Sequence, residues 1–261
     1  MVITSKDNEQ IKYIRKLKDK KARDVRGEFF IEGMKLIREA IEENADIKTI
    51  VICDDCVKAG EISKKELYAI AKYNCIYASE NVFHNIADVQ TPQGILAVVG
   101  KGEPKEEIKY DEDIIVVLDD VQDPGNMGTI LRTMDSIGLK QVVASKGCVD
   151  IYNPKVVRAT MGAIFRVNVM ESDDLKETIK DLKKRKIQIV ATSPNTQDTI
   201  YDVKYKKTAI VVGNESNGIS EEVMALADKK VKIPMLGRAE SLNASVATGI
   251  TLYEYVRQRL T

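Results

Sequence analysis

Short apolar runs alternate with amphipathic stretches along the second half of the chain. Ile114–Leu118 is a continuous apolar run of the kind found in buried strands, and Met127–Ile137 has a helical periodicity that ends at Gly138. The same alternation predicts further strands at Gln141–Ala144, Phe165–Val169, Ile187–Ala191, Thr208–Val212 and Lys230–Ile233, and further helices at Lys155–Met161, Asp173–Lys184, Ser220–Leu226 and Asn243–Arg259. Strands that alternate with helices indicate an α/β fold with a parallel sheet covered on both faces.

The first half of the chain shows a shorter version of this pattern. It predicts helices at Lys35–Glu43 and Lys64–Lys72 and strands at Ile47–Cys53 and Gly94–Val99, which together form a small α/β unit. A polar stretch with two glycines and a proline, residues 100–107, then separates two apolar strands. We therefore expect two domains, residues 1–105 and 113–261, joined by a linker at 106–112.

The charge balance excludes one class of nucleic-acid binder. The 261 residues carry 40 Lys plus Arg and 40 Asp plus Glu, so the chain cannot find nucleic acid through bulk charge, although a local patch stays possible. Between residues 12 and 26, basic side chains crowd around an apolar side formed by Ile11, Ile14 and Leu17. This stretch is either a solvated amphipathic helix or a phosphate-contacting patch, whose candidate RNA-binding residues are Lys12, Arg15, Lys16, Lys20, Arg23 and Arg26.

Histidine and cysteine usage argues against several kinds of chemistry. The one histidine, His84, lies among apolar residues with no nucleophile motif nearby, so we interpret it as structural or exposed. Cys53 and Cys56 have the spacing of a zinc or redox pair, but no second pair follows, and we expect no metal site. No apolar run approaches the length of a membrane span and no secretion signal is visible, so we expect a cytoplasmic protein without a membrane partner.

Three polar loops follow predicted strands directly, which is where open α/β sheets bind ligands. The first, residues 119–128, contains Asn126, which we expect to cap the following helix, while Arg132 projects away from that helix's apolar side. The second, residues 213–218, begins and ends with glycine, and the third, residues 233–246, leads into the final helix. That helix carries an apolar stripe that packing in the core alone could explain, formed by Val246, Ile250, Tyr253 and Val256. Neither a Walker motif nor a dinucleotide fingerprint occurs, which disfavours nucleotide triphosphate chemistry and a Rossmann dehydrogenase.

In their order and spacing these loops resemble the motifs of the SpoU family of RNA ribose 2′-O-methyltransferases, within the knotted SPOUT superfamily. The resemblance covers Asp113 to Arg259 and departs visibly only at Ala244, where valine is commoner. The matching residues are Asn126 and Arg132 in the first motif, Gly213, Glu215 and Gly218 in the second, and Ile233–Met235 with Ser241–Ala247 in the third. The first half is similar to the substrate-binding domain found in many members, which is related to a ribosomal protein that binds kinked RNA, through Phe29–Gly33 and Thr91–Gly94.

This resemblance implies a fold, a reaction and a set of roles. The fold is a parallel-sheet SPOUT domain with a deep trefoil knot, preceded by a small α/β RNA-binding domain. The reaction transfers a methyl group from S-adenosylmethionine to a ribose 2′-hydroxyl, and the family works as a homodimer with the final helix at the interface. Gly213, Ile233 and Leu242 would line the cofactor site, and Arg132 would act as general base or as a clamp on phosphate and developing charge. The residues that would fix Arg132, the ribose and the pocket are Asn126, Glu215, Ser241 and Asn243.

The sequence does not determine which RNA is the substrate. The separate first domain favours structured 23S ribosomal RNA over tRNA, because tRNA-specific relatives often lack that module. A non-catalytic RNA-binding or ribosome-assembly factor that kept the fold is the alternative from another class, and the three intact motifs argue against it.

Overall fold

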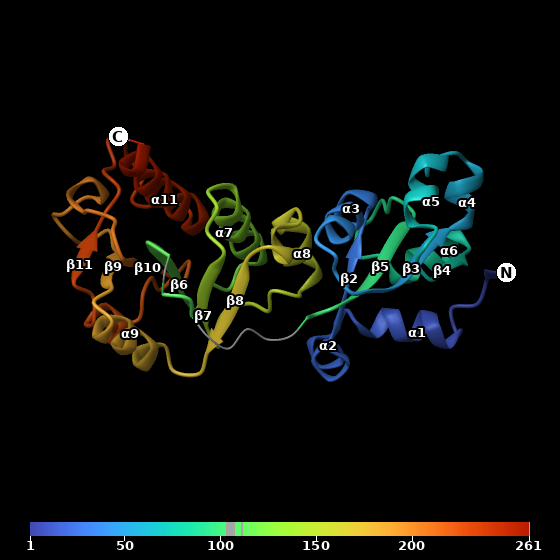
Figure 1. Ribbon diagram of the computed structural model, residues 1–261, viewed down its shortest axis with the longest axis horizontal. Coiled ribbons are helices and arrows are strands. Elements are labelled where there is room, and N and C mark those ends of the chain that lie inside the picture. The colour runs from blue at the N-terminus through green and yellow to red at the C-terminus, as the bar shows by residue number, and fades with distance from the viewer. Residues whose placement is uncertain (103–107, 111, 261) are drawn as a thin grey trace. The chain divides into compact units, whose positions relative to one another are not determined.

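The computed structural model describes residues 1–102, 108–110 and 112–260, and the chain forms two compact units (Figure 1). One unit comprises Met1–Pro104 together with Tyr152–Phe165, and the other comprises Lys105–Ile151 together with Arg166–Thr261. Part of the predicted linker, at positions 106, 107 and 111, lies outside the described residues.

The first unit is built on a mixed five-stranded sheet of order β1-β4-β3-β5-β2, in which β5 runs antiparallel to both of its neighbours. The strands are β1 (Val2–Ile3), β2 (Glu28–Glu32), β3 (Ile47–Cys53), β4 (Cys75–Ala78) and β5 (Ile95–Gly100). The helices are α1 (Glu9–Lys16), α2 (Lys20–Arg26), α3 (Met34–Glu42), α4 (Asp54–Lys58), α5 (Lys64–Ile70) and α6 (Glu80–Ile86). One face of the sheet buries Ile37 of α3 and Ile70 of α5, and the other buries Ile11 of α1 and Phe83 of α6.

The basic stretch forms two short helices instead of one. Asp19 caps α2 by accepting a hydrogen bond from the backbone N–H of Lys21, which stops α1 from continuing. Gly27 then ends α2 in the left-handed region at φ 64°. The expected helices and strands of this half are confirmed within a few residues, whereas β1, β2, β4, α4 and α6 were not predicted.

A segment from the second half of the sequence packs with this first unit. It contains α8 (Pro154–Thr160) and a 3-10 turn, Ala163–Phe165. Val157 lies in the core with Phe29, whose ring centroid is 4.8 Å from that of Tyr152, and Arg158 donates a hydrogen bond to Asp88. The strand predicted at Phe165–Val169 is present but begins three residues later, as β8 (Asn168–Ser172), because Phe165 packs against the first unit's core.

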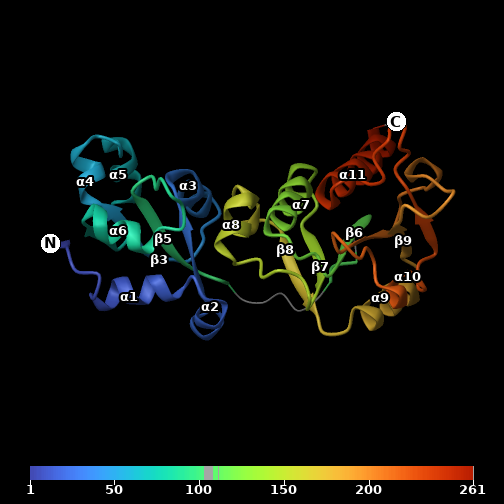
Figure 2. The ribbon, with the colours of Figure 1, turned by 180° about the vertical axis from the view of Figure 1, so that it is seen from behind.

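The second unit confirms the predicted parallel sheet, with six strands in the order β11-β9-β10-β6-β7-β8. Its other strands are β6 (Ile114–Asp119), β7 (Gln141–Ser145), β9 (Gln188–Thr192), β10 (Thr208–Gly213) and β11 (Lys229–Val231). The helices are α7 (Pro124–Ser136), α9 (Leu175–Lys184), α10 (Glu221–Met224) and α11 (Ala244–Leu260). Figures 1 and 2 show α7 and α11 on one face of this sheet and α9 and α10 on the other.

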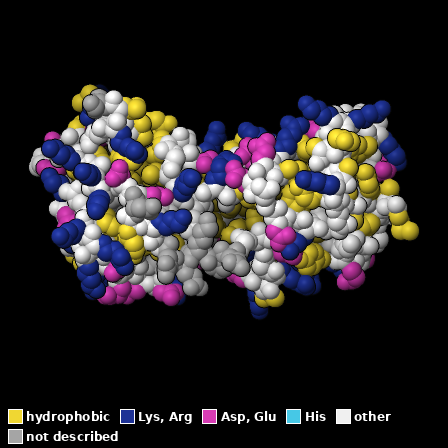
Figure 3. All heavy atoms as spheres, viewed as in Figure 1, with side chains coloured by type: hydrophobic (Ala, Val, Ile, Leu, Met, Phe, Trp, Pro, Cys, Tyr) yellow, Lys and Arg dark blue, Asp and Glu magenta, His cyan; other side chains and the backbone are white. Residues whose placement is uncertain are grey.

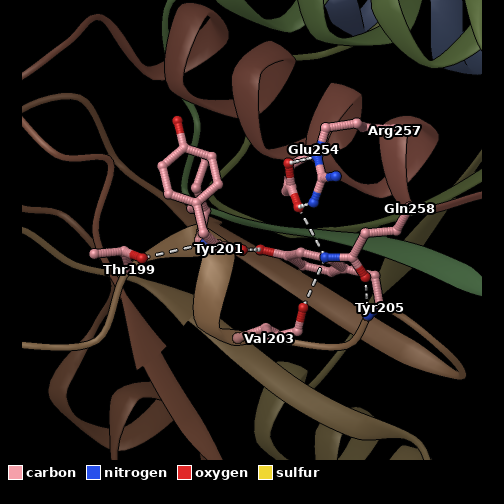
Figure 4. Close-up of polar contacts among 8 residues, drawn as sticks. Thr199, Tyr201, Val203, Tyr205, Glu254, Arg257 and Gln258 are labelled. Atoms are coloured by element: carbon pink, nitrogen blue, oxygen red, sulfur yellow. Dashed lines mark hydrogen bonds and ion pairs between the residues drawn. The ribbon is translucent and has the colours of Figure 1, made fainter. Parts of the chain in front are cut away.

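Helix α11 is anchored near its C-terminal end to a 3-10 turn, Ile200–Asp202, and the residues that follow it (Figure 4). The amide of Gln258 donates to the carbonyl of Val203 at 2.8 Å and accepts from the backbone N–H of Tyr205 at 3.2 Å. Glu254, on the same side of the helix, accepts from Gln258 and Arg257 at 2.8 Å each. These bonds fix one side of α11 against the unit.

Candidate functional site

The register of the central strands brings the first two motif loops together. In the parallel pair β6 and β10, Asp119 lies opposite Gly213, so the loops that follow these strands leave the sheet at the same edge. Asn214 ties them by donating its side-chain N–H to the carbonyl of Asp120 at 2.8 Å. Asp119 is held by the backbone N–H and hydroxyl of Ser220, at 2.8 Å each.

Asn126 does not cap its helix, which corrects the expectation from the sequence. Asp123 is the cap, because its carboxylate accepts the backbone N–H of Asn126 at 2.8 Å and Pro124 occupies the first turn. The Asp-Pro pair is the signal that identifies this cap, and it was missed. Asn126 is instead buried within the first turn of α7, with only 6% of its surface exposed.

The buried amide of Asn126 joins all three loops. Its side-chain N–H donates to Glu215 at 2.9 Å, and its carbonyl oxygen accepts from the side-chain N–H of Asn243 at 2.8 Å. Asn243 in turn caps α11, because its carbonyl oxygen accepts from the backbone N–H and the hydroxyl of Ser245 at 2.9 and 2.7 Å. A single polar chain therefore runs from the second loop through the first to the third.

Glu215 is held as an anion. Its carboxylate accepts the Asn126 amide and the backbone N–H groups of Gln122 and Asp123, at 3.2 and 3.1 Å. Partial burial acts to raise the pKa of Glu215, but these hydrogen bonds outweigh it and hold the pKa below the ordinary value. A carboxylate that is stabilised in this way is a poor proton acceptor, and its hydrogen bonds hold the first loop against the second.

Gly213 is required by the backbone itself. A Cβ atom at this position would lie 2.2 Å from the carbonyl carbon of Gly218, closer than any side chain allows. The close approach arises because Asn214 and Gly218 exchange two backbone hydrogen bonds of 2.9 Å, which fold the second loop back on itself.

Arg132 and Ser241 do not join the polar chain. Both are exposed, and Arg132 forms no hydrogen bond or ion pair with any residue that the structure describes. Arg132 lies six residues along α7 from Asn126, which is about 9 Å at the rise of an α-helix. Its guanidinium is thus free to contact a ligand that reaches this edge of the sheet.

The third loop has the features of a binding site for a flat ligand that forms hydrogen bonds with backbone amide groups. Ile233 and Leu242 are half-buried, whereas Gly213 is buried at the end of β10. Between β11 and α11, the backbone N–H groups of Ile233 and of residues 235–242 have no hydrogen-bond partner within the described part of the chain. Half-buried aliphatic side chains beside free backbone donors and acceptors fit an adenine ring and its polar edge.

Burial divides the candidate RNA-binding residues of the first unit into one buried arginine and five residues at or near the surface. Arg23 is only 2% exposed and donates to the carbonyls of Leu17 and Lys18 at 2.8 Å, so it holds the turn between α1 and α2 and is not available to a phosphate. The other five lie at or near the surface: Lys12, Arg15, Lys16, Lys20 and Arg26. On the face drawn in Figure 3, basic side chains are interspersed with acidic and apolar ones, in keeping with a net charge of zero.

The histidine and the cysteine pair that the sequence singled out do not belong to the polar chain of the motif loops. His84 is half-exposed on α6, 3.8 Å from Glu80, and burial raises the pKa of the Cys56 thiol. Among the described residues, no cluster of three or more His, Cys, Asp or Glu could hold a metal ion, and no helix is long and apolar enough to cross a membrane.

Comparison with known proteins gives matches along both halves of the chain. Residues 113–253 match the SpoU rRNA Methylase family, and residues 8–97 match the MRM3-like substrate binding domain. A 23S rRNA (guanosine(2553)-2′-O)-methyltransferase of Bacillus subtilis is 31% identical over 96% of this chain and 97% of its own length. The crystal structure of an RNA 2′-O ribose methyltransferase superposes with a TM-score of 0.87 at 30% identity, covering 100% of both chains. The SpoU methyltransferase AviRb from Streptomyces viridochromogenes, solved in complex with AdoMet, superposes with a TM-score of 0.85 at 28% identity over 97% of this chain and 99% of that one.

Proposed function

The chain belongs to the SpoU rRNA methylase family, and we propose that it methylates the 2′-hydroxyl of a ribose in 23S ribosomal RNA with S-adenosylmethionine as methyl donor. The observation that carries this proposal is the polar chain Glu215–Asn126–Asn243, which joins the three motif loops at one edge of the parallel sheet. The Bacillus subtilis relative is named for a guanosine of 23S rRNA and a Streptomyces viridochromogenes relative for a uridine of 23S rRNA, so the nucleotide differs between relatives.

The third loop and the end of β10 are the proposed cofactor site. When bound, S-adenosylmethionine supplies an electrophilic methyl group. Gly213, Ile233 and Leu242 would hold its adenosine part through backbone amides and aliphatic contacts, which the free backbone groups of residues 233–242 support. The packing of Gly213 against Gly218 folds the second loop back on itself, and the hydrogen bond from Asn214 to the carbonyl of Asp120 holds that loop against the first.

Arg132 is the proposed catalytic residue. The ribose hydroxyl is a weak nucleophile, and its reaction requires stabilisation of the negative charge that develops on the 2′-oxygen. A guanidinium stays protonated in proteins, so Arg132 is better suited to hold the adjacent phosphate and that oxygen than to remove the proton. Asn126, Glu215 and Asn243 position the helix that carries Arg132, and Ser241 is proposed to contact the ribose.

The test compares Arg132→Ala with Lys140→Ala, which removes an exposed cation beyond the other end of α7. We expect Arg132→Ala to lower methyl transfer to unmodified 23S rRNA by about 100-fold or more, the usual cost of removing one charge-stabilising donor, while calorimetric titration shows unchanged S-adenosylmethionine affinity. Near-normal turnover of Arg132→Ala would contradict the assignment. Transfer to tRNA instead of 23S rRNA would assign the alternative substrate, and a protein that binds RNA without methylating either would be a non-catalytic factor.

We also propose a separate role for each domain. Residues 1–105 would bind RNA, residues 113–261 would carry methyl transfer and the knot of the SPOUT fold, and residues 106–112 would link them. Lys16 and Lys20, whose side chains form no hydrogen bond or ion pair among the described residues, are the best available phosphate contacts, together with Lys12, Arg15 and Arg26. Because Tyr152–Phe165 packs with the first unit, mutations there should affect RNA binding before they affect cofactor binding.

We propose a homodimer whose interface includes the exposed side of α11. Val246 and Tyr253 are 49% and 53% exposed, so packing in the core does not account for the apolar stripe that they form with Ile250. Gly249 allows close approach beside Thr133 of α7, where an added Cβ would still be 3.8 Å from the threonine methyl group. Light scattering should give the mass of a dimer, and Tyr253→Glu should give a monomer while Tyr68→Glu, on the exposed side of α5, should not.

We propose the cytoplasm as the compartment of this protein, and the four free cysteines suit its reducing conditions.

A further inference from the structure

A cavity of about 370 Å³ lies between α1 and the first unit's sheet, and none of the residues assigned to methyl transfer lines it. Its apolar lining is formed by Ile14, Ile76 and Val98, of which Ile14 and Val98 are buried in the core. Its polar lining comes from Glu9, Gln10, Glu28, Lys48 and Thr49, and Tyr13 contributes an aromatic ring. The cavity is therefore apolar at its base, with polar groups around it.

The ring of Tyr13 is held in place from two directions. Its hydroxyl donates a hydrogen bond to Oε2 of Glu28, and the guanidinium of Arg26 lies 4.8 Å from the ring centroid. Burial, followed by the interaction with Glu28, raises the pKa of Tyr13 to about 12, so the hydroxyl stays a donor at neutral pH. A fixed aromatic ring in the wall of a cavity is a platform on which a flat ligand can stack.

The open polar groups of the cavity are a carboxylate oxygen, which only accepts hydrogen bonds, and a side-chain amide, which both donates and accepts. Oε1 of Glu28 and the side-chain amide of Gln10 have no hydrogen-bond partner among the residues that the structure describes. Lys48 is engaged by Asp46 at 2.6 Å, and the hydroxyl of Thr49 donates to a backbone carbonyl at 2.8 Å. A ligand in this cavity must therefore present N–H donors to a carboxylate, and a phosphate would be repelled by Glu9 and Glu28.

We propose that this cavity binds an unpaired nucleobase that carries an exocyclic amino group, stacked on Tyr13 and donating to Glu28. The proposal rests on the proposed function, because the basic helices α1 and α2 beside the cavity would bind the backbone of the same RNA. Unpaired bases that stack on an aromatic side chain and bond through their edges are the usual means of sequence-specific RNA recognition. Uracil has no amino group, and its N3–H lies between two carbonyl oxygens that the Glu28 carboxylate would repel, so we expect the cavity to prefer guanine, adenine and cytosine to uracil.

The chain contains no tryptophan, which allows a single-tryptophan reporter. In Tyr13→Trp the indole would occupy the stacking position, and Tyr68→Trp, at a residue 86% exposed on α5, is the matched control. We expect an octauridylate with one central guanosine to quench the emission of Tyr13→Trp saturably, octauridylate to quench it little, and neither RNA to affect Tyr68→Trp. Equal quenching of both reporters would overturn the proposal, as would an unresponsive Tyr13→Trp protein that still methylates 23S rRNA.

A second measurement uses the native tyrosine. By fluorescence anisotropy, the guanosine-containing octamer should bind the wild-type protein about fivefold or more tighter than octauridylate, from the stacking and edge contacts of one base. Glu28→Gln should reduce this preference to within about twofold, since it removes the charged acceptor from the cavity. A preference that survives in Glu28→Gln would overturn the assignment of Glu28. Failure of the proposed function would appear separately, as absence of methyl transfer by the wild-type protein.

Discussion

The bridge from Asn126 to Glu215 and Asn243 can be tested by Asn126→Asp, which keeps the side-chain shape. The oxygen that accepts from Asn243 at 2.8 Å is retained, but the N–H that donates to Glu215 at 2.9 Å is replaced by a second anionic oxygen. An attraction at the junction of the three loops thus becomes a repulsion between two carboxylates.

The expected cost follows from the contacts that change. Loss of a hydrogen bond to a charged acceptor costs about 1.5–3 kcal/mol, and the low end applies because Glu215 is exposed to solvent. Repulsion between two carboxylates near the protein surface adds about 1 kcal/mol once solvent screening is considered. We therefore expect Asn126→Asp to lower the free energy of unfolding by about 2–3 kcal/mol at pH 7, and to lower methyl transfer as well, because Arg132 lies on the same helix.

The dependence on pH identifies the cause. Two adjacent carboxylates share a proton, so the pKa of one of them is raised in the folded variant above its unfolded value. A raised folded pKa gives stability that is present at low pH and is lost as pH rises through it, so the deficit of Asn126→Asp should shrink on acidification. Asn126→Ala, which adds no charge, should recover less on acidification, only by the part of the lowered Glu215 pKa that the Asn126 amide supplies. Urea denaturation at several pH values measures both, and a deficit in Asn126→Asp that does not change with pH would refute the repulsion.

Three further changes are expected to act on stability, as measured by thermal denaturation. Gly213→Ala should cost about 2 kcal/mol or more, because its Cβ would lie 2.2 Å from the Gly218 carbonyl carbon, whereas Gly237→Ala, with no atom within 4 Å, should be tolerated. Asp123→Ala should cost about 1 kcal/mol as a lost helix cap, while Ser79→Ala, at a cap position without a side-chain hydrogen bond, should cost nothing measurable. Arg23→Ala should cost about 1–3 kcal/mol by leaving the backbone carbonyls that it satisfies without their donor, and an unchanged melting temperature would return it to the RNA-contacting set.

Patterns that span only a few residues were sufficient to predict most strands and helices of the second unit. Continuous apolar runs such as Ile114–Leu118 identify strands buried on both faces, and the amphipathic stretches between them identify the covering helices. The order of the three motif loops carried the resemblance to the family, and the first two of them lie directly behind such strands. In the first unit the signals were weaker, since strands such as β4 are short and only partly buried.

The tertiary structure decided which of these residues meet. Asn126 and Glu215 are far apart in the sequence, and they come together because β10 pairs with β6, a choice of strand order that no local pattern contains. Phe165 reads as strand because it is apolar, but its apolar surface is used by a core formed with Phe29, more than a hundred residues earlier.

The sequence by itself determined the fold class, the succession of strands and helices in the catalytic half, and the family with its motif residues, because these depend on periodicity and on spacing along the chain. Only the tertiary structure decided that Asn126 lies between Glu215 and Asn243, that Arg23 is buried, and that a cavity opens beside Tyr13. The physical reason is that charge and polarity are properties of a residue, whereas burial and hydrogen-bond partners depend on which distant segments the fold places against it.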